Sequence, residues 1–600
     1  MESNSRSSIS IEGTKWNTSV PYLLGNTLDV HYKGIILRAF EQFGLKSCIN
    51  FIPRQNENDF IHIQKLEGCF SYVGKKVSGG QNVSIGSGCA IVPIVEHMLL
   101  HALGFFHEQS RYDRDDHVTI IWENIQEGKE YEFNKMSENE SSLLDTPYDY
   151  TSVMHYNKNE FSNGNGSTII TKHPEFQDVI GDSREMSSTD ALELNRLYHC
   201  DASVSFLDHC SFEDESLCKM SVCSRCSAEW QRVSRADGGP HSDHTHLGTD
   251  SQGSFMHFST KHSSEGDSAR LTTRRMTPGR PCQVQCLQFY YYYSGNEKDQ
   301  LDIWIREFDS EEDTGTRRLM GQISGILVIL VMSQVFTLIS DSHGYLIHTK
   351  FSPAEYWQVH NVPLNATKTF RVEFEARKGP GSSSGGFSVD DINLSETECP
   401  HQTWQIRNFE EVLSISKKNS LYGAILYSPR YYSIDGYGYQ ILLQLRKTVF
   451  GVYVRLVSGD YDDTLEWPLT WRQISARIMD QNPHMQLRMS WERSLTPNPT
   501  RLSGGSPREE GKLTTVGGET FYASSAWGWR SFMTAEDLQK RDFLKGGDAF
   551  FFFTMQDLRP LLEPTNNSLP CATLPLYGSR YALQNSIHHV LTFQSKIFAL

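Results

Sequence analysis

Residues 94–116 read IVEHMLLHALGFFHEQSRYDRDD and contain three histidines, His97, His101 and His107. On a helix, His97 and His101 project from the same face, about one turn from each other. Gly104 can adopt a positive φ and end that helix, so that the chain carries His107 back towards the first two imidazoles. Three neutral imidazoles that converge on one point form a zinc site with an open fourth position, which is typical of catalytic zinc. The spacing therefore predicts catalytic zinc; the alternative is three structural histidines.

The composition is that of a soluble globular protein. The chain has 600 residues, of which 38 % are hydrophobic and 21 % charged, and its formal net charge is -16. At about 150 residues per domain, this length predicts roughly four folded units. A surface of net negative charge repels phosphate backbones, so the charge argues against a nucleic-acid partner.

Cysteines and glycosylation sequons indicate an extracellular or cell-surface protein of the secretory pathway. The chain has 12 cysteines, and no pair of CxxC motifs is placed as in a zinc ribbon. Residues 1–10, MESNSRSSIS, lack the apolar core of a signal peptide, so we expect the start of the chain to be incomplete. The N-x-[ST] sequons begin at Asn17, Asn82, Asn139, Asn165, Asn365, Asn393 and Asn566.

Composition changes along the chain suggest its division. A first unit, 14–200, closes with NRLYHC, and a second extends over 206–399. A third, 400–562, contains strand-like stretches such as YGYQILLQL between turn residues, while 563–600 has no clear pattern. An apolar stretch, SGILVILVMSQVFTLI at Ser324–Ile339, interrupts the second unit at about 320–342. It is shorter than the roughly 20 residues of a membrane span, so we interpret it as a buried strand pair or an insertion.

The histidine segment resembles the extended zinc signature of the astacin metalloendopeptidases, within the metzincin clan. A second motif, SVMHY at 152–156, resembles the Met-turn of that family. The resemblance implies that Met154 lies under the zinc, and that Tyr156 approaches the metal and stabilises the transition state. It also implies the disulfides Cys48–Cys200 and Cys69–Cys89.

The later units resemble two further domain families. HCSFEDESLC and GGFSVDDINLSETEC are similar to the two ends of a MAM domain, which implies the disulfides Cys210–Cys218 and Cys286–Cys399. TWQIRNF, LYSPRYY, SGDYDDTLEWP and RDFLKGGDAF are similar to parts of a MATH (TRAF-like) domain. Astacin, MAM and MATH in this order is the layout of the meprins. No partners can be assigned to Cys223, Cys226 and Cys282.

The resemblance implies a fold and a set of partners. We expect a two-lobed α+β protease domain of the metzincin type with one Zn²⁺, followed by two all-β sandwich domains, MAM and MATH. An edge strand around Gly86–Ala90 would pair with an extended peptide or protein substrate. Association with copies of the chain or with other meprin-like subunits would use the MAM and MATH domains.

One position departs from the family signature, because the motif begins His-Glu and this chain has His97-Met98. In the family that glutamate is the general base, which takes a proton from the zinc-bound water and passes it to the leaving amine. A thioether can do neither. Glu96 is rotated by about 100° along the helix, and Glu108 belongs in the family to a contact with the mature N-terminus. We therefore predict a zinc-loaded protease fold with impaired catalysis.

Substrate preference has a weaker signal. Meprins favour acidic residues just after the scissile bond, and Lys129 and Arg184 lie at or beside positions where the family keeps cations. The alternative for both is a solvated surface cation. Three functions remain open: an active astacin-type metalloendopeptidase, a pseudoprotease that binds peptides or a partner subunit, and an adhesion or assembly protein that acts through MAM and MATH.

Overall fold

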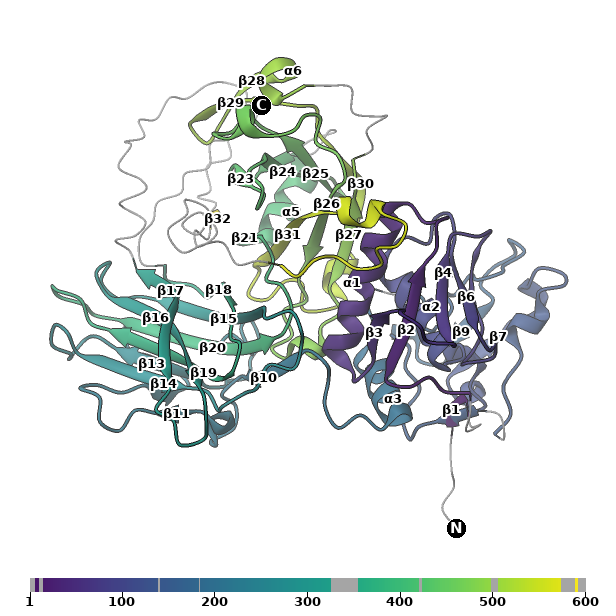
Figure 1. Cartoon of the computed structure of the whole chain (residues 1–600), viewed down its shortest axis with the longest axis horizontal. Coiled ribbons are helices and arrows are strands. Elements are labelled where there is room, and N and C mark those ends of the chain that lie inside the picture. Colours follow the sequence, from purple (N-terminus) through teal and green to yellow (C-terminus); the bar gives the residue numbers. More distant parts are fainter. Residues whose placement is uncertain are drawn as a thin grey trace, which may run out of the picture.

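Three domains are packed together in the computed structural model of the chain (Figure 1). In Figure 1 the purple-to-blue domain and the teal domain lie on opposite sides, and the green-to-yellow domain contacts both. Each of the three contains a separate apolar core. The structure describes residues 6–9, 14–138, 141–182, 184–324, 354–419, 424–497, 505–572 and 589–591.

A five-stranded sheet and two helices form the first lobe of the N-terminal domain. The sheet order is β3-β2-β4-β6-β5, and β5 alone is antiparallel to its neighbour. The helices α1 and α2 bury apolar residues at helical spacing against this sheet, among them Ile36 and Phe43. The bounds are β2 (Ser19–Leu24), α1 (Val30–Lys46), β3 (Asn50–Pro53), β4 (Phe60–Gln64), β5 (Cys69–Ser71), β6 (Gly80–Ile85) and α2 (Val92–Leu103).

A second, smaller lobe follows α2 and has its own core, which includes Phe133 and Ile169. The helix α3 returns the chain to the first lobe, where Leu194 joins its core. The expected two-lobed α+β fold is confirmed. The remaining elements are β1 (Arg6–Ile9), β7 (Val118–Ile120), β8 (Ser141–Leu143), β9 (Ile169–Thr171) and α3 (Ser188–Tyr198).

The edge of the first sheet differs from the sequence expectation. Residues 86–90 form a turn after β6, and the strand that ends the sheet order is β5, Cys69–Ser71. A disulfide between Cys69 and Cys89 joins this turn to the edge strand. A Cβ at Gly86 would lie 2.3 Å from the carbonyl oxygen of Gly68, so only glycine allows the two segments to approach this closely.

The second domain, which we call the MAM domain after its resemblance, is a sandwich of two antiparallel sheets, as expected. Its inner faces share a core that contains Phe289 and Phe374. The first sheet contains β10 (Phe206–Cys210), β12 (Gln231–Val233), β13 (Phe255–Ser259), β15 (Gln285–Tyr293), β18 (Gln358–Leu364) and β20 (Gly386–Ser395). The second contains β11 (Ser221–Val222), β14 (Ser268–Thr272), β16 (Gln300–Phe308), β17 (Thr316–Ser324) and β19 (Thr369–Arg377).

The third domain, which we call the MATH domain after its resemblance, is a second β-sandwich, with Trp404 and Tyr439 in its core. Two short helices, α5 (Phe409–Asn419) and α6 (Pro507–Glu510), accompany the strands. One sheet contains β21 (Gln402–Ile406), β26 (Arg472–Ile478), β27 (Trp491–Leu495), β31 (Ala549–Asp557) and β32 (His589–Leu591). The others contain β22 (Ala424–Tyr427), β23 (Tyr431–Tyr432), β24 (Gly438–Leu445), β25 (Val449–Leu456) and β30 (Trp527–Thr534), and the hairpin β28 (Lys512–Val516) and β29 (Glu519–Ala523).

The MAM and MATH domains share buried contacts. Tyr290 and Trp357 of the MAM domain pack with Met479 and Phe550 of the MATH domain in one apolar cluster. Because these rings lie on the outer face of the first MAM sheet, the MATH domain covers that face.

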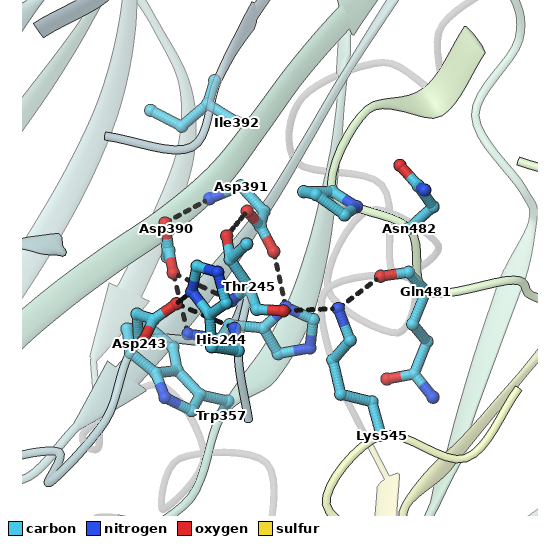
Figure 2. A network of polar contacts seen from close by, with 12 residues as sticks. Asp243, His244, Thr245, Trp357, Asp390, Asp391, Ile392, Gln481, Asn482 and Lys545 are labelled. Atoms are coloured by element: carbon cyan, nitrogen blue, oxygen red, sulfur yellow. Dashed lines mark hydrogen bonds and ion pairs between the residues drawn. The ribbon is translucent and has the colours of Figure 1, made fainter. Parts of the chain in front are cut away.

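A buried polar network lies beside this apolar cluster (Figure 2). In the MAM domain, His244 Nδ1 lies 2.6 Å from a carboxylate oxygen of Asp391, and the Thr245 hydroxyl donates to the same carboxylate. The ammonium of Lys545, from the MATH domain, donates to the carbonyls of Thr245 and Gln481. The two domains therefore share hydrogen bonds as well as apolar area.

Ion pairs join the protease domain to the MATH domain. The guanidinium of Arg38, on α1, donates to both carboxylate oxygens of Glu492, at 3.1 and 2.9 Å. Arg477 donates to the same carboxylate at 2.9 Å. Next to this pair, Lys46 donates to the carbonyl of Arg488 at 2.8 Å.

All twelve cysteines are paired, in six disulfides. They include the four pairs that the family resemblance implies, Cys48–Cys200, Cys69–Cys89, Cys210–Cys218 and Cys286–Cys399. The unassigned cysteines also have partners, since Cys223 pairs with Cys226 and Cys282 with Cys571. The last pair joins residues 289 apart, and no local spacing indicates it.

The segment 558–571 fastens all three domains together, although the sequence after residue 562 has no recognisable pattern. Leu561 packs against Val30 of α1, and the side chain of Asn567 accepts a hydrogen bond from the backbone N–H of Leu24 at 2.8 Å. Four residues later Cys571 joins the MAM domain. The tail from residue 563 therefore begins as an ordered strap.

The apolar stretch Ser324–Ile339 lies outside the described residues except for its first residue, which ends β17. Among the residues that the structure describes, no helix is both long and apolar enough to cross a membrane.

The ion pairs of Glu492 predict a loss of stability in acid. Burial alone would raise the pKa of Glu492, but Arg38 and Arg477 outweigh burial and lower it to about 2, from an ordinary value of 4.5. A carboxylate with a lowered pKa stabilises the fold above its unfolded-state pKa, and this stabilisation disappears as the pH falls towards its folded-state pKa. As the pH falls from about 5 to about 2, the free energy of unfolding of the parent should decrease by about 3 kcal/mol more than that of Glu492→Gln. Urea titration of both proteins at each pH measures this difference. If the free energies of unfolding of the two proteins fell in parallel with pH, the prediction would be contradicted. The control is Glu41→Gln, which removes the other carboxylate that pairs with Arg38.

The Cys282–Cys571 disulfide should contribute more stability than the Cys223–Cys226 disulfide, because it closes a much longer loop of the unfolded chain. We expect Cys282→Ser/Cys571→Ser to lower the free energy of unfolding by about 3 kcal/mol more than Cys223→Ser/Cys226→Ser. Denaturant titration of both double variants measures the difference. Equal losses of unfolding free energy would mean that the Cys282–Cys571 disulfide stabilises the fold no more than the Cys223–Cys226 disulfide does.

Candidate metal centre

The helix α2 presents the first two histidines. It begins after Ile91 with Pro93 in its first turn, and it ends at Gly104, whose φ of 114° is left-handed. The backbone N–H of Phe105 donates to the carbonyl of Leu100 and closes this end of the helix. The reversal at Gly104 allows the chain to return towards the helix, as its position in the sequence predicts.

The three predicted ligands lie together. The ring centroids of His97 and His101 are 4.6 Å apart, and those of His101 and His107 are also 4.6 Å apart. The two Nε2 atoms of His101 and His107 are 3.2 Å apart, and one nitrogen from each of the three rings lies within 4.8 Å of the others. The cluster contains three imidazoles and no carboxylate among the described residues.

Backbone carbonyls hold two of the rings in place. His97 Nδ1 lies 2.8 Å from the carbonyl oxygen of Val153, and His101 Nδ1 lies 2.8 Å from that of Phe105. A carbonyl only accepts, so Nδ1 of each ring carries the proton and Nε2 keeps its lone pair for a metal. Burial lowers the pKa of His101 to about 3 and that of His107 well below its ordinary value, and in each case the neighbouring histidines of the cluster lower it further. The rings are therefore neutral and suited to bind a cation.

The spacing of the rings fits a tetrahedral metal. Two nitrogen ligands at about 2.1 Å from a tetrahedral zinc are themselves about 3.4 Å apart. The 3.2 Å between the Nε2 atoms of His101 and His107 is close to this value. Neutral imidazole nitrogens suit a borderline-soft first-row ion rather than Ca²⁺ or Mg²⁺, which prefer oxygen ligands.

The predicted Met-turn lies against this cluster. Met154 is 2 % exposed and belongs to the core of the first lobe. Its carbonyl accepts a hydrogen bond from the backbone N–H of Glu108 at 3.0 Å, while the preceding carbonyl, of Val153, holds His97. The turn is therefore bonded to both ends of the histidine segment.

Asp190 is a supporting residue that sequence analysis did not single out. Its carboxylate accepts hydrogen bonds from the Ser152 hydroxyl at 2.6 Å and from the Val153 backbone N–H at 2.9 Å. It also completes a capping box with Ser187 at the start of α3. The sequence does contain a signal for the cap, the S-x-x-D pattern of Ser187 to Asp190, but nothing in it indicates the contact with the turn.

Tyr156 lies beside the third histidine. Its ring centroid is 4.3 Å from that of His107, and its backbone N–H donates to the side chain of Gln109 at 3.0 Å. Burial raises the pKa of the Tyr156 phenol above its ordinary value, and the nearby carboxylate of Glu132 raises it further. Glu132 is the second residue near the site that sequence analysis did not single out.

Met98 stands where the signature has its acid, and the adjacent carboxylates point elsewhere. The thioether of Met98 is half-buried against the core of the first lobe. Glu96 is fully buried, accepts from the backbone N–H of Met186 at 2.6 Å, and has a pKa that burial raises to about 8. Glu108 pairs with Arg111 at 3.1 Å. Both carboxylates therefore have partners away from the three imidazoles.

The two candidate specificity cations occupy different surroundings. Lys129 is half-buried, and its ammonium lies 3.7 Å from the carboxylate of Glu132 and 5.1 Å from the ring centroid of Phe161, which contacts Tyr156.

Arg184 is 4 % exposed, and its guanidinium lies 2.7 Å from Asp182 and 3.3 Å from Asp537 of the MATH domain. It also lies 5.2 Å from the centroid of Phe543. The alternative that Arg184 is a solvated surface cation is therefore wrong, because the MATH domain buries it.

Three known domain families match consecutive parts of the chain. They are the Astacin peptidase family over residues 8–199, the MAM domain, meprin/A5/mu, over 210–400, and the MATH domain over 401–555.

Similar proteins include three mammalian meprin subunits. The chain is 42 % identical to the mouse protein named meprin A subunit beta, over 96 % of this chain and 79 % of the relative. It is 42 % identical to the human protein of the same name, over 93 % and 76 %, and 38 % identical to rat meprin A subunit alpha, over 93 % and 72 %. With the same three domains in the same order and this identity along most of its length, the chain belongs to the meprins, which are metallopeptidases of the astacin family.

Proposed function

We propose that the chain is a meprin-like metalloendopeptidase scaffold that binds one Zn²⁺ and binds extended peptides, but hydrolyses them poorly because Met98 occupies the position of the general base. The observation that supports the proposal is a cluster of three neutral imidazoles in which Met98, and not an acid, follows His97 in the helix, while the carboxylates of Glu96 and Glu108 are bonded elsewhere.

The chain's own residues prepare the site for a cation and a substrate. His97, His101 and His107 would hold Zn²⁺, which when bound acts as a Lewis acid on water and on the scissile carbonyl. Carbonyls fix the tautomers of His97 and His101, so no proton has to leave those rings before a metal binds. The hydroxyl of Tyr156, whose ring lies against His107, would donate to an oxygen that becomes negative during acyl transfer.

The missing function is proton transfer. Hydrolysis of an amide needs a group that accepts a proton from water and delivers it to the leaving nitrogen, and such a group contributes about 10² to 10⁴ in rate. The thioether of Met98 has no basic lone pair of this strength and no proton to deliver. Binding of the metal and of the peptide does not require this group, so both should remain.

An active enzyme is the second candidate, and Glu132 is the observation that favours it. Its carboxylate is close enough to the phenol of Tyr156 to raise the pKa of that group, and the ring of Tyr156 lies against His107. If Glu132 accepts the proton in place of the missing acid, the parent chain cuts peptides and Glu132→Gln does not. A third candidate, assembly through the MAM and MATH domains alone, predicts that peptides do not bind in a zinc-dependent way.

The relatives and the six disulfides support a location in the secretory pathway, at the cell surface or outside the cell. Protein or peptide substrates, and association with copies of the chain or with other meprin-like subunits through MAM and MATH, follow from the same relatives as proposals.

Removal of one imidazole should abolish metal binding. We expect about one Zn²⁺ per parent chain by elemental analysis after dialysis, and near-zero zinc in His101→Ala, because a two-histidine site loses most of its affinity. His173→Ala, which alters an exposed histidine of the same domain, is the control. Equal zinc content in all three proteins would mean that the three imidazoles do not form the site.

Restoring the acid should restore hydrolysis. We expect zinc-loaded Met98→Glu to cleave a quenched peptide with an acidic residue after the scissile bond about 10² to 10⁴ times faster than the parent. Met98→Gln has the shape of glutamate without its basicity and should stay as slow as the parent. A parent rate comparable to that of Met98→Glu and sensitive to chelators would overturn the proposal, and the effect of Glu132→Gln would then identify the base.

A further inference from the structure

The MAM sandwich has two outer faces, and only one of them is used within the described part of the chain. The MATH domain covers the outer face of the first sheet through Tyr290 and Trp357. The outer face of the second sheet, which we call the β16–β19 face, carries the outward residues of β14, β16, β17 and β19. Its arginines keep between 18 % and 46 % of their side-chain surface exposed, and among the described residues no other domain packs on them.

Three arginines form a row across this face. Arg306 on β16 is the direct register partner of Arg371 on β19 and of Arg317 on β17. Direct partners on neighbouring strands point to the same side of a sheet, about 4.8 Å from strand to strand. The row therefore extends over about 10 Å. Like charges in direct register are destabilising, so such a row is not what stability alone would select.

A buried carboxylate holds the row together. Glu373 has a fully buried side chain, and its oxygens lie 2.6 Å from Arg306, 2.8 Å from Arg317 and 3.0 Å from Arg371. A fourth guanidinium, of Arg270, lies 3.7 Å away. One negative charge is thus shared among four positive ones, and because it lies beneath them, the guanidinium groups are what meets the solvent.

Aromatic rings order the guanidinium groups. Arg317 lies 4.1 Å from the centroid of Trp304, and Arg371 lies 5.5 Å from that of Phe308. Guanidinium groups that are held in place in this way match planar or tetrahedral anions with several oxygens, because each N–H group that is not turned towards Glu373 can donate to such an anion. Arg377 adds a fifth guanidinium group to the sheet face, while Glu375, which also pairs with Arg317 at 2.9 Å, and Asp302 add two carboxylates. The outward strand residues therefore carry more arginines than carboxylates.

From this arrangement we infer that the β16–β19 face of the MAM domain is a binding surface for a linear sulfated polysaccharide. Charge complementarity supports it, because a row of guanidinium groups fits a polymer whose anionic groups follow one another along a line. The net charge of the chain is -16, so the protein as a whole repels a polyanion, and binding requires a local cluster of cations such as this one. Six disulfides place the protein in an oxidising compartment, where sulfated polysaccharides rather than nucleic acids are available.

The test is titration calorimetry of the whole chain with a size-defined heparin oligosaccharide at low and at physiological ionic strength. We expect binding that weakens with salt, and at least about a tenfold loss of affinity in Arg317→Gln/Arg371→Gln. This double variant leaves Arg306 and Arg270 beside Glu373, so that its carboxylate stays paired. The control is Arg54→Gln/Arg235→Gln, which removes the same charge from exposed arginines outside this face.

Several outcomes would overturn the inference. They are an absence of binding at low salt, an equal loss in the control, or equally tight row-dependent binding of a polyglutamate, which would point to an acidic protein partner. Dissociation of a dimer by the row variant in sedimentation would mean that a second copy occupies the face. Thermal melting of each variant shows whether it is folded. Should the row variant be unfolded, Arg270→Gln/Arg377→Gln replaces it, with the same expected loss.

Discussion

The structure of the protease domain depends on the reversal of the chain at Gly104. Because this residue adopts a left-handed conformation, α2 ends one turn after His101 and His107 returns to face it. The carbonyl of Phe105, in the same reversal, orients His101. A side chain at this position would strain the turn, and the three imidazoles would no longer share one point.

The metal ligands and the proton acceptor are separate requirements, and on the proposed function the sequence meets only the first. Ligand geometry is built from the helix, the reversal and the carbonyl of Val153, none of which involves the residue after His97. On the proposed function, proton transfer depends on the one position that Met98 occupies. A chain can therefore keep a complete metal site and lose most of its catalytic power, and nothing in the packing around the half-buried Met98 opposes the change.

Sequence reasoning is most successful where the chemistry is local. The spacing of His97, His101 and Gly104 predicts the ligand geometry because a helix and its terminus fix it. Sequence reasoning fails where segments that are distant along the chain contact each other. The burial of Arg184 by the MATH domain and the pairing of Cys282 with Cys571 depend on how whole domains pack, and the expected edge strand is wrong because Gly86 forms a turn against Gly68. The roles of Asp190 and Glu132 likewise follow from contacts across the fold.

The claim that a peptide-binding zinc site has lost its base is tested most directly by following one peptide for both binding and cleavage. The zinc-loaded parent chain is incubated with a labelled peptide while fluorescence anisotropy reports binding and mass spectrometry reports the peptide's integrity. We expect the peptide to bind, to remain intact, and to be released when a chelator removes the zinc. Cleavage during the incubation would contradict the claim that the base is lost, and binding that is unaffected by the chelator would contradict the claim that the metal site receives the peptide.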